Sequence, residues 1–384
     1  MPQPHLLRVA LGGLLVAAVL GVAGCTSGDG GPADPSAPAS DAAPDTGDAT
    51  DTGTGTGTPT DTDTPSAPAD GTPTAGAAPR PFGAITPDTI RSAPNTLVFD
   101  GGLAVEPNSL AARAAERLAA QGRDGAARAA ELIAERPVAL WLGDGHDDAA
   151  LVDEITDYLV AAELQDATPV FVTYAIPDRD CGNYSAGGLA ADDYPAWNQL
   201  VADTLRGHRA VVIVEPDSLG MLSRCPELAD ERLPLIRESV AAFADAGVPA
   251  YLDGGNSNWV PAREMADRLE QAGVDRARGF YTNVASFYPV DDERAYAERV
   301  SELTGDSRYV IDVSRNGRGW RGTWCNPEGA GLGQDPHVTG GSKGLDAFLW
   351  VKTPGISDGT CNDGPPAGEW WASYAEGLVE RRRE

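Results

Sequence analysis

The chain is poor in lysine and has a large excess of acidic residues. Among its 384 residues, 57 are Asp or Glu and 29 are Lys or Arg, which gives a formal net charge of −28. The two lysines are Lys343 and Lys352. Because no basic stripe is present, a nucleic acid is excluded as a partner, and the same charge repels anionic lipid headgroups. A neutral substrate fits this charge balance.

The usual patterns for binding metals and phosphate groups are also missing. His146, His208 and His337 have no metal-ligand spacing, and LGDGHDDAALVDE (142–154) lacks the alternating ligands of a calcium loop. We interpret that segment as a loop, an N-cap and a helix. No glycine-rich phosphate-binding fingerprint follows the early candidate strands, which argues against a dinucleotide fold. We therefore predict no metal and no cofactor.

Residues 1–24 have the features of an export signal. Arg8 precedes an apolar run at 9–22 that is too short for a comfortable membrane span and ends in small residues. The sequence VAGC resembles the bacterial lipoprotein processing box, which implies a lipid on Cys25. Ordinary cleavage with a free Cys25 is the alternative. We expect an exported protein, attached to the outer face of the membrane only through this lipid, or secreted.

Residues 25–80 consist mainly of Asp, Thr, Gly, Pro, Ser and Ala. Such a segment has no apolar periodicity and cannot bury enough surface to become ordered. We interpret it as a tether with a root-mean-square reach of roughly 40 Å. Residues 81–384 are then the folded domain, catalytic or binding, which we expect to be a monomer.

Four cysteines remain besides Cys25. An even number in an exported chain predicts two disulfides, since no pair has metal-ligand spacing. Three pairings are possible. We expect the pairing of sequence neighbours, which joins Cys181 to Cys225 and Cys325 to Cys361.

Short β-rich or apolar runs alternate with helical patterns along the folded domain. The seven candidate strands are 138–141, 169–174, 210–215, 250–253, 279–284, 308–313 and 347–352. This alternation predicts an α/β fold with a parallel sheet that is buried on both faces. An open doubly wound sheet and a closed barrel both satisfy it.

Reactive and aromatic residues at the ends of these runs favour a parallel (β/α) barrel. Catalytic residues of such barrels gather at the carboxyl ends of the strands and in the loops that follow. One carboxylate in such a place is usually a helix N-cap, but capping alone does not explain the feature after six runs. The residues are Trp141, Tyr174 with Asp180, Glu215 with Asp217, Asp253, Asp312, and Lys352 with Asp358.

Six motifs occur in the order expected of glycoside hydrolase family 6, which contains endoglucanases and cellobiohydrolases. They are TYAIPDRDCGNYSAGG, VVIVEPDSL, YLDGGNSNWV, VIDVSRNGRG, WCNPEGAGLG and DAFLWVKTPGISDG. The chain resembles this family from about Phe99 to Leu378. The resemblance implies a distorted TIM-like barrel with about seven strands and hydrolysis with inversion at the anomeric carbon.

The resemblance also implies catalytic roles for three carboxylates. Asp217 matches the general acid, and Asp180 matches the carboxylate that raises the pKa of this acid and supports the oxocarbenium-like transition state. Asp358 matches the proposed base, although a water relay is an alternative. Without the resemblance, Asp217 would be a helix N-cap and Asp358 a turn residue. Glu215 and Asp253 match positions that shape the hydrogen-bond network.

A second group of residues matches the family's substrate-binding positions. Tyr174 matches the tyrosine beneath the distorted sugar ring, and Lys352 matches a lysine that binds sugar hydroxyls. Apolar sugar faces lie well on indole rings. Trp324 is either a stacking platform for a sugar ring or a core residue. The complete set is Trp141, Tyr174, Trp259, Asn283, Trp324 and Lys352.

The chain departs from the family pattern at several positions. Asn256 replaces a histidine and Ile356 replaces a glutamate, while Asp335 and Thr339 replace an arginine and an asparagine; Ser286-Phe287 stands near an expected Asn-Tyr. We expect these positions around the substrate, where lost hydrogen bonds cost about 1 kcal/mol each. Because the acid–base residues are kept, the departures suggest altered specificity.

The sequence thus predicts an endo-acting glycosidase that cuts internal β-1,4 bonds of cellulose or a related β-glucan. The segment 357–371 is short and leaves little chain to roof a tunnel. The alternatives are an exo-acting cellobiohydrolase and a surface-tethered glucan-binding protein with little turnover.

Overall fold

The computed structural model describes residues 85–382. The predicted signal (1–24), the lipidation of Cys25 and the tether (25–80) lie outside the described residues. The described residues belong to one compact unit. No helix within residues 85–382 is long and apolar enough to cross a membrane.

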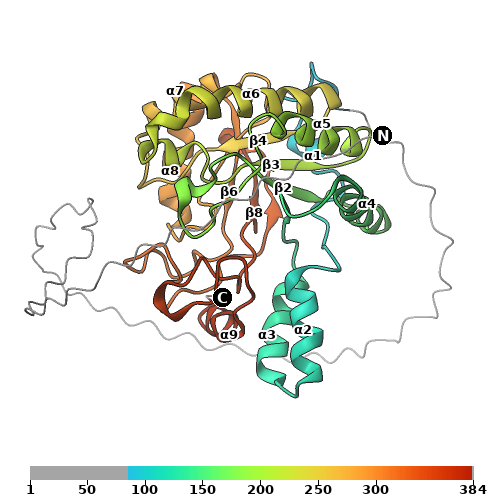
Figure 1. Cartoon of the computed structure of the whole chain (residues 1–384), viewed down its shortest axis with the longest axis vertical. Coiled ribbons are helices and arrows are strands. Elements are labelled where there is room, and N and C mark those ends of the chain that lie inside the picture. The colour runs from blue at the N-terminus through green and yellow to red at the C-terminus, as the bar shows by residue number, and fades with distance from the viewer. Residues whose placement is uncertain (1–84, 383–384) are drawn as a thin grey trace, which may run out of the picture. The chain divides into compact units, whose positions relative to one another are not determined.

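Within these residues, an eight-stranded sheet with the order β1-β2-β3-β4-β5-β6-β8-β7 forms the centre of the fold (Figure 1). Strands β1 to β6 and β8 run parallel to one another, and β7 is antiparallel to β8. The strands are β1 (Leu140–Gly143), β2 (Val170–Tyr174), β3 (Val211–Val214), β4 (Ala250–Asp253), β5 (Gly279–Thr282), β6 (Arg308–Asp312), β7 (His337–Val338) and β8 (Leu345–Leu349).

The sheet curls until its two ends approach each other. Val138, just before β1, forms an isolated parallel bridge with Trp350, just after β8, and the Ala139 amide donates to the Trp350 carbonyl at 3.0 Å. The result is a distorted, incompletely closed barrel, so the predicted α/β barrel with about seven parallel strands is confirmed. The last strand begins at Leu345 and not at residue 347. Its second residue, Asp346, is charged and was therefore left out of the predicted apolar run.

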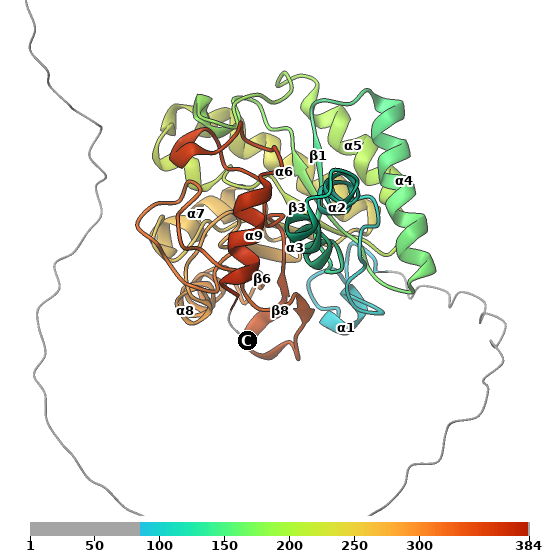
Figure 2. The ribbon, with the colours of Figure 1, turned by 90° about the horizontal axis from the view of Figure 1, so that it is seen from below.

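Helices cover the outside of the sheet. The helices α4 to α8 each follow one of the strands β1 to β5, as a right-handed βα alternation requires. The antiparallel pair α2–α3 projects from the domain and packs through α3 against α9 (Figures 1 and 2). The helices are α1 (Asn95–Val98), α2 (Leu110–Ala120), α3 (Asp124–Ala134), α4 (Asp148–Leu164), α5 (Tyr194–Leu205), α6 (Ala229–Ala246), α7 (Ala262–Gln271), α8 (Val290–Leu303) and α9 (Ala372–Glu380).

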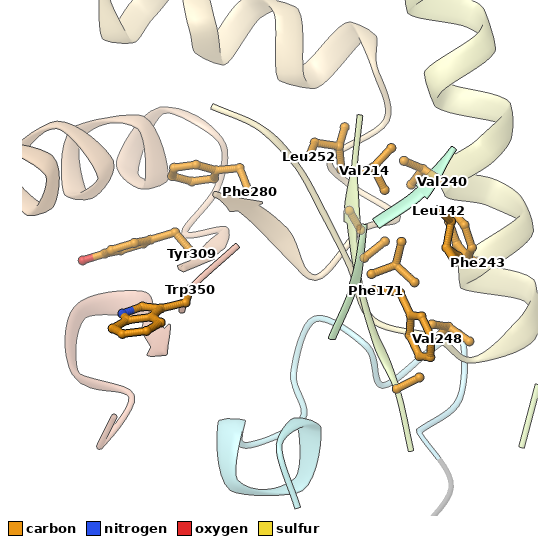
Figure 3. Packing of buried hydrophobic residues seen from close by; sticks show 14 of the residues in the cluster. Leu142, Phe171, Val214, Val240, Phe243, Val248, Leu252, Phe280, Tyr309 and Trp350 are labelled. Atoms are coloured by element: carbon orange, nitrogen blue, oxygen red, sulfur yellow. The ribbon is translucent and has the colours of Figure 1, made fainter. Parts of the chain in front are cut away.

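Both faces of the strands are buried, which explains their continuous apolar runs. In β3, Val212 and Val214 pack in the layer between sheet and helices, where Figure 3 shows Val214 near Val240 and Phe243 of α6. The alternate residues Val211 and Ile213 belong to a second cluster inside the barrel. Asp253 and Asp312 occupy the last positions of β4 and β6, and these carboxyl ends of the strands carry the site.

A buried ion pair closes the amino end of the barrel. Arg278 lies 2.8 Å from Asp346, and neither side chain is exposed to solvent. Arg278 also donates to the carbonyls of Ile90, Arg91 and Ala93, which fixes the segment before α1 under the barrel. The carboxyl end of the barrel is therefore the open one for chemistry.

Candidate active site

Carboxylates follow five strands at the carboxyl end of the barrel. They are Asp180 after β2, Glu215 and Asp217 after β3, Asp253 in the last position of β4, Asp312 in the last position of β6, and Asp358 after β8. The charges of Asp253, Asp180 and Asp358 each raise the pKa of Asp217, and Lys352 lowers it. The structure therefore brings the three predicted catalytic carboxylates and Lys352 within electrostatic reach of one another.

Asp217 is the group in the site that most strongly favours its protonated form. Burial raises its pKa well above the usual range, and the neighbouring charges of Asp253 and Asp180 raise it further. Within residues 85–382, no hydrogen bond engages the Asp217 carboxyl group, and the residue keeps partial access to solvent from a largely desolvated position. A carboxyl group whose pKa is raised in this way, and which no hydrogen bond engages, is suited to donate a proton.

The backbone that presents Asp217 is strained. Glu215 has φ 47° and Asp217 has φ 71°, so two non-glycine residues in a stretch of three adopt left-handed conformations. Each such residue costs on the order of 1 kcal/mol or more and persists only where its surroundings enforce it. Strain of this kind concentrates at functional sites.

Glu215 and Asp253 supply the contacts that enforce this turn. The buried Glu215 carboxylate accepts hydrogen bonds from the amides of Ala175 and Ile176 and from the Tyr194 hydroxyl. Asp253 accepts from the amides of Leu219 at 3.0 Å and Gly220 at 2.8 Å, just after Asp217. The two buried acids therefore position the turn between them.

Asp358 has the opposite electrostatic environment. Arg315 Nη1 lies 3.0 and 2.9 Å from its two carboxylate oxygens, and Lys352 Nζ lies 3.2 Å away. The Asn326 amide donates to the same carboxylate at 3.0 Å. Burial opposes ionisation, but Arg315 and then Lys352 outweigh it and hold the pKa of Asp358 below its usual range. Asp358 is thus a fixed negative charge.

Asp180 lies on a tight loop after β2. Its carboxylate accepts from the Ser185 amide at 3.0 Å, and both Asp180 and Cys181 have positive φ values of 56° and 48°. Cys181 is bonded to Cys225, so a disulfide joins this loop to the segment after β3. The second disulfide, Cys325–Cys361, joins the loops after β6 and β8. The predicted pairing is confirmed.

Aromatic side chains surround the carboxylates. The Trp141 ring meets Tyr174 edge-on at 5.0 Å, and its Nε1 donates to the Val351 carbonyl at 2.8 Å. Burial and then the charge of Asp217 raise the pKa of Tyr174, whose ring is stacked under Arg179. These contacts fix both rings beside the acid.

Two further tryptophans differ in their degree of burial. Trp324 is 48% exposed and its ring lies 6.2 Å from that of Tyr184. Trp259 is half-buried and packs on Gly220, where a Cβ atom would lie 2.6 Å from the indole. Gly220 therefore provides the space for Trp259, and Trp324 has the exposure expected of a sugar platform rather than of a core residue.

Asn283 does not present its amide to solvent. It is fully buried at φ 68°, and its Nδ2 donates to the carbonyls of Tyr288 and Asp312. Its Oδ1 accepts from the Tyr288 amide at 3.1 Å. In this structure Asn283 holds the loop after β5.

The departures from the family pattern lie in different parts of the domain. Asn256 donates to Ser286 at 3.1 Å, and the buried Ile356 lies two residues before Asp358. Asp335 forms ion pairs with Arg136 and Arg382 on the surface. Thr339 pairs through its amide with Asp346 near the start of β8. The expectation that all lie around the substrate is therefore wrong for Thr339, which is at the other end of β8 from Asp358.

Sequence reasoning missed Arg315 and Asn326 as residues of the site. Both occur in motifs that the resemblance already marked, SRNG and WCNP. Arg315 is buried without solvent exposure, and its second terminal nitrogen donates to the Ala285 carbonyl. A buried arginine requires a partner, but its burial is visible only in the folded chain, so the place of both residues in these motifs was the available signal.

The site contains a carboxyl group that favours its protonated form, a carboxylate that is held ionised, and aromatic rings beside both. Hydrolysis of a glycosidic bond requires such a pair of carboxyl groups with opposed pKa shifts. The fold and the site thus define a glycosidase. The sequence profile described as Glycosyl hydrolases family 6 matches residues 101–382, and the chain belongs to that family.

Several curated proteins are similar to the chain. Endoglucanase A of Cellulomonas fimi is 39% identical over 282 residues, which are 73% of this chain and 62% of that protein. Endoglucanase 1 of Streptomyces halstedii is 37% identical over 320 residues, covering 80% of this chain and 94% of that protein. A protein named probable 1,4-beta-D-glucan cellobiohydrolase C from Aspergillus fumigatus is 29% identical over 322 residues, and the match covers 65% of this chain and 70% of that protein.

Solved structures agree with this assignment. An endoglucanase Cel6 from Mycobacterium tuberculosis, in complex with methyl-cellobiosyl-4-deoxy-4-thio-β-D-cellobioside, has a TM-score of 0.68 and 38% identity and covers 76% of this chain and 99% of that one. The catalytic core of a cellobiohydrolase from Chaetomium thermophilum has a TM-score of 0.65 and 25% identity, with 74% and 98% covered.

Proposed function

We propose that this protein is an inverting endo-β-1,4-glucanase in which Asp217 is the general acid. The observation that carries the proposal is the opposed pKa shift of Asp217 and Asp358 at one end of the barrel. An inverting glycosidase needs one acid to protonate the leaving oxygen and one carboxylate to assist a water on the opposite face of the sugar. The two residues have the environments that these roles require.

The reaction then follows from the surroundings of each group. Asp217 transfers its proton to the glycosidic oxygen as the bond to the anomeric carbon breaks. Asp180 and Asp358 stabilise the positive charge that develops on the sugar ring. A water attacks from the opposite face, with Asp358 as the acceptor of its proton either directly or through a second water. Arg315 and Lys352 keep Asp358 ionised, so its carboxylate is available to accept this proton by either route.

Substrate-binding roles follow from the aromatic and cationic side chains. Tyr174 lies beneath the ring that reacts, with Trp141, Trp259 and Trp324 as stacking platforms for other sugars of the chain. Lys352 binds sugar hydroxyls from its position beside Asp358. Asn283 acts through the loop that it holds.

The proposed β-glucan substrate is supported by the relatives. The bacterial proteins at 35–39% identity are named endoglucanases, and the fungal proteins at 28–29% are named cellobiohydrolases or an exoglucanase. The ligand in the Mycobacterium tuberculosis structure is a thio-linked cellobioside. A cellulose-type chain is therefore the substrate that we propose.

The loop after Asp358 supports internal cutting over release from chain ends. Ile356 forms a bridge with Trp370, and the Ser357 amide donates to the Glu369 carbonyl at 2.9 Å. Between these points the loop turns back on itself, and Cys361 fastens it to Cys325. A loop tied to its own base leaves no length to cross over the substrate.

The test compares viscosity with reducing ends during digestion of a soluble β-1,4-glucan. Internal cutting lowers viscosity early, and proton NMR of fresh product shows the α anomer first because the reaction inverts. Steady release of cellobiose at preserved viscosity would establish exo action. Binding without any release of reducing ends would establish the glucan-binding alternative, and β product first would refute the mechanism.

Residues outside the described range carry a separate part of the proposal. We propose that Cys25 is lipidated and that residues 25–80 tether the catalytic domain outside the cell. Two disulfides support an oxidising compartment. Mass spectrometry of the native N-terminus decides the point, since an unmodified Cys25 in the culture medium would contradict lipidation.

A further inference from the structure

A stacked pair of aromatic rings lies beyond the residues that the family resemblance marks. Tyr288, in the loop after β5, and Trp320, in the loop after β6, have ring centroids 5.0 Å apart and planes that differ by 3°. Trp320 is 37% exposed, so part of its indole ring is accessible to a ligand. Both loops leave the carboxyl end of the barrel, the end that carries Asp217 and Asp358.

Buried amide side chains hold this pair in place. Asn283 and Asn316 donate to the Tyr288 carbonyl at 3.2 and 3.1 Å, and Asn283 also accepts from the Tyr288 amide. The loop after β4 contributes Asn258, whose Nδ2 donates to the Tyr288 hydroxyl at 2.9 Å. Three loops thus converge to fix the position of one partly exposed aromatic pair.

The pair is connected to the catalytic charges through adjacent residues. Arg315, which holds Asp358, precedes Asn316, and the Arg315 guanidinium lies over the ring of Phe287, which precedes Tyr288. Tyr288 is therefore bonded in the chain to Phe287 and hydrogen-bonded to Asn316, which are the neighbours of Arg315 in space and in sequence, at the end of the barrel that carries Asp217 and Asp358.

We propose that Tyr288, Trp320 and Asn258 form an additional subsite that binds a sugar residue of the β-glucan chain remote from the bond that is cut. This rests on the proposed function. A pyranose ring presents an apolar C–H face, which suits the exposed indole, and a rim of hydroxyls, which suits the amide of the exposed Asn258. The net charge of −28 favours such a neutral ligand over an acidic one.

The test uses Trp320→Ala in the full chain with two substrates. One is cellotetraose, and the other is a long soluble β-1,4-glucan. We expect KM for the long glucan to rise about five- to tenfold, the equivalent of roughly one stacking contact, with kcat unchanged. The kinetic constants for cellotetraose stay at the wild-type values. Trp320→Tyr restores most of the loss, because it keeps an aromatic face.

The control is Leu164→Ala, since Leu164 is an apolar side chain 85% exposed at the end of α4. We expect Leu164→Ala to leave KM and kcat unchanged for both substrates. Unfolding curves establish whether each variant is folded. If Trp320→Ala does not fold, the milder variant Asn258→Ala replaces it in the same test. Equal losses on both substrates, or no loss on either, would overturn the subsite.

Affinity electrophoresis in gels that contain the long glucan separates this proposal from the proposed function. If the wild type binds without hydrolysing and Trp320→Ala binds more weakly, the subsite stands and the endoglucanase proposal fails. If the wild type hydrolyses and Trp320→Ala migrates like the wild type, the subsite fails and the enzyme proposal stands.

Discussion

Arg315 and Asp358 form an ion pair in which one guanidinium nitrogen lies within 3.0 Å of both carboxylate oxygens, and at most 3% of either side chain is exposed. A buried charge of this kind is tolerated only because its partner is present. The pair gives the site a fixed negative charge, and this charge acts on Asp217.

Replacing the proposed acid should affect substrates according to their leaving groups. In Asp217→Ala, turnover of a natural β-glucan falls about 10²- to 10⁴-fold because no proton reaches the leaving oxygen. Aryl glycosides with acidic leaving groups lose less, since they need little protonation. The measurement is kcat for both substrate types. Asp203→Ala, on the surface of α5, is the control, and equal losses on both substrate types would contradict the assignment.

The two lysines allow a matched test of the charge around the acids. Lys352 lies beside Asp358 and lowers the pKa of both Asp358 and Asp217. In Lys352→Met both pKa values rise, so both limbs of the kcat/KM profile against pH move to higher pH, and kcat falls through lost sugar contacts. Lys343→Met removes an exposed lysine paired with Glu298 and leaves the profile in place. If neither limb of the Lys352→Met profile moves, the charge of Lys352 does not lower the pKa values of Asp217 and Asp358.

The parallel sheet could be predicted because both faces of each strand are buried, which gives continuous apolar runs such as VVIV (211–214). The reactive residues at the ends of these runs, together with the family resemblance, favoured a barrel over an open sheet. The start of β8 was harder to predict, because Asp346 can be buried there only through its ion pairs with Arg278 and Arg308, which are distant in the sequence. Such compensation is invisible until the chain is folded.

The site could be predicted in part, because polar residues that follow buried strands are visible in the sequence. Carboxylates at strand ends point to the chemistry, but their pKa directions depend on which cations pack beside them. Nothing local distinguishes Asp358, with Arg315 and Lys352, from Asp217, which has neither as a hydrogen-bond partner among residues 85–382. The stack of Tyr288 on Trp320 likewise arises from two loops, and no sequence pattern joins them.

Removal of the disulfide next to Asp358 should affect stability and turnover together. Cys325 precedes Asn326, which bonds to Asp358 in both directions at 3.0 and 2.8 Å. The double variant Cys325→Ala/Cys361→Ala loses about 4 kcal/mol on the chain-entropy estimate and also loses kcat, because Asp358 is no longer fixed. Urea unfolding and kcat are the measurements. Wild-type kcat in a destabilised variant would show that the disulfide does not position Asp358.

The last prediction concerns Glu293, a buried acid of α8 outside the proposed chemistry. It has no solvent exposure, its Oε1 accepts from the Ser257 amide at 2.9 Å, and burial raises its pKa to about 7. Because the folded-state pKa is above the unfolded value, its contribution to stability is full below about pH 4.5 and is lost as the pH rises through 7.

The wild type should therefore lose up to about 3 kcal/mol of unfolding free energy through this residue between about pH 5 and pH 8. Asp312, whose pKa burial raises to about 6, adds a second loss in the same direction. Glu293→Gln removes the ionisation and keeps the acceptor for Ser257, so its stability falls less over this range. Urea unfolding at several pH values measures the slopes, with the exposed Glu302→Gln on the same helix as control. If Glu293→Gln keeps the full wild-type slope, Glu293 stays ionised in the folded protein and the prediction is wrong.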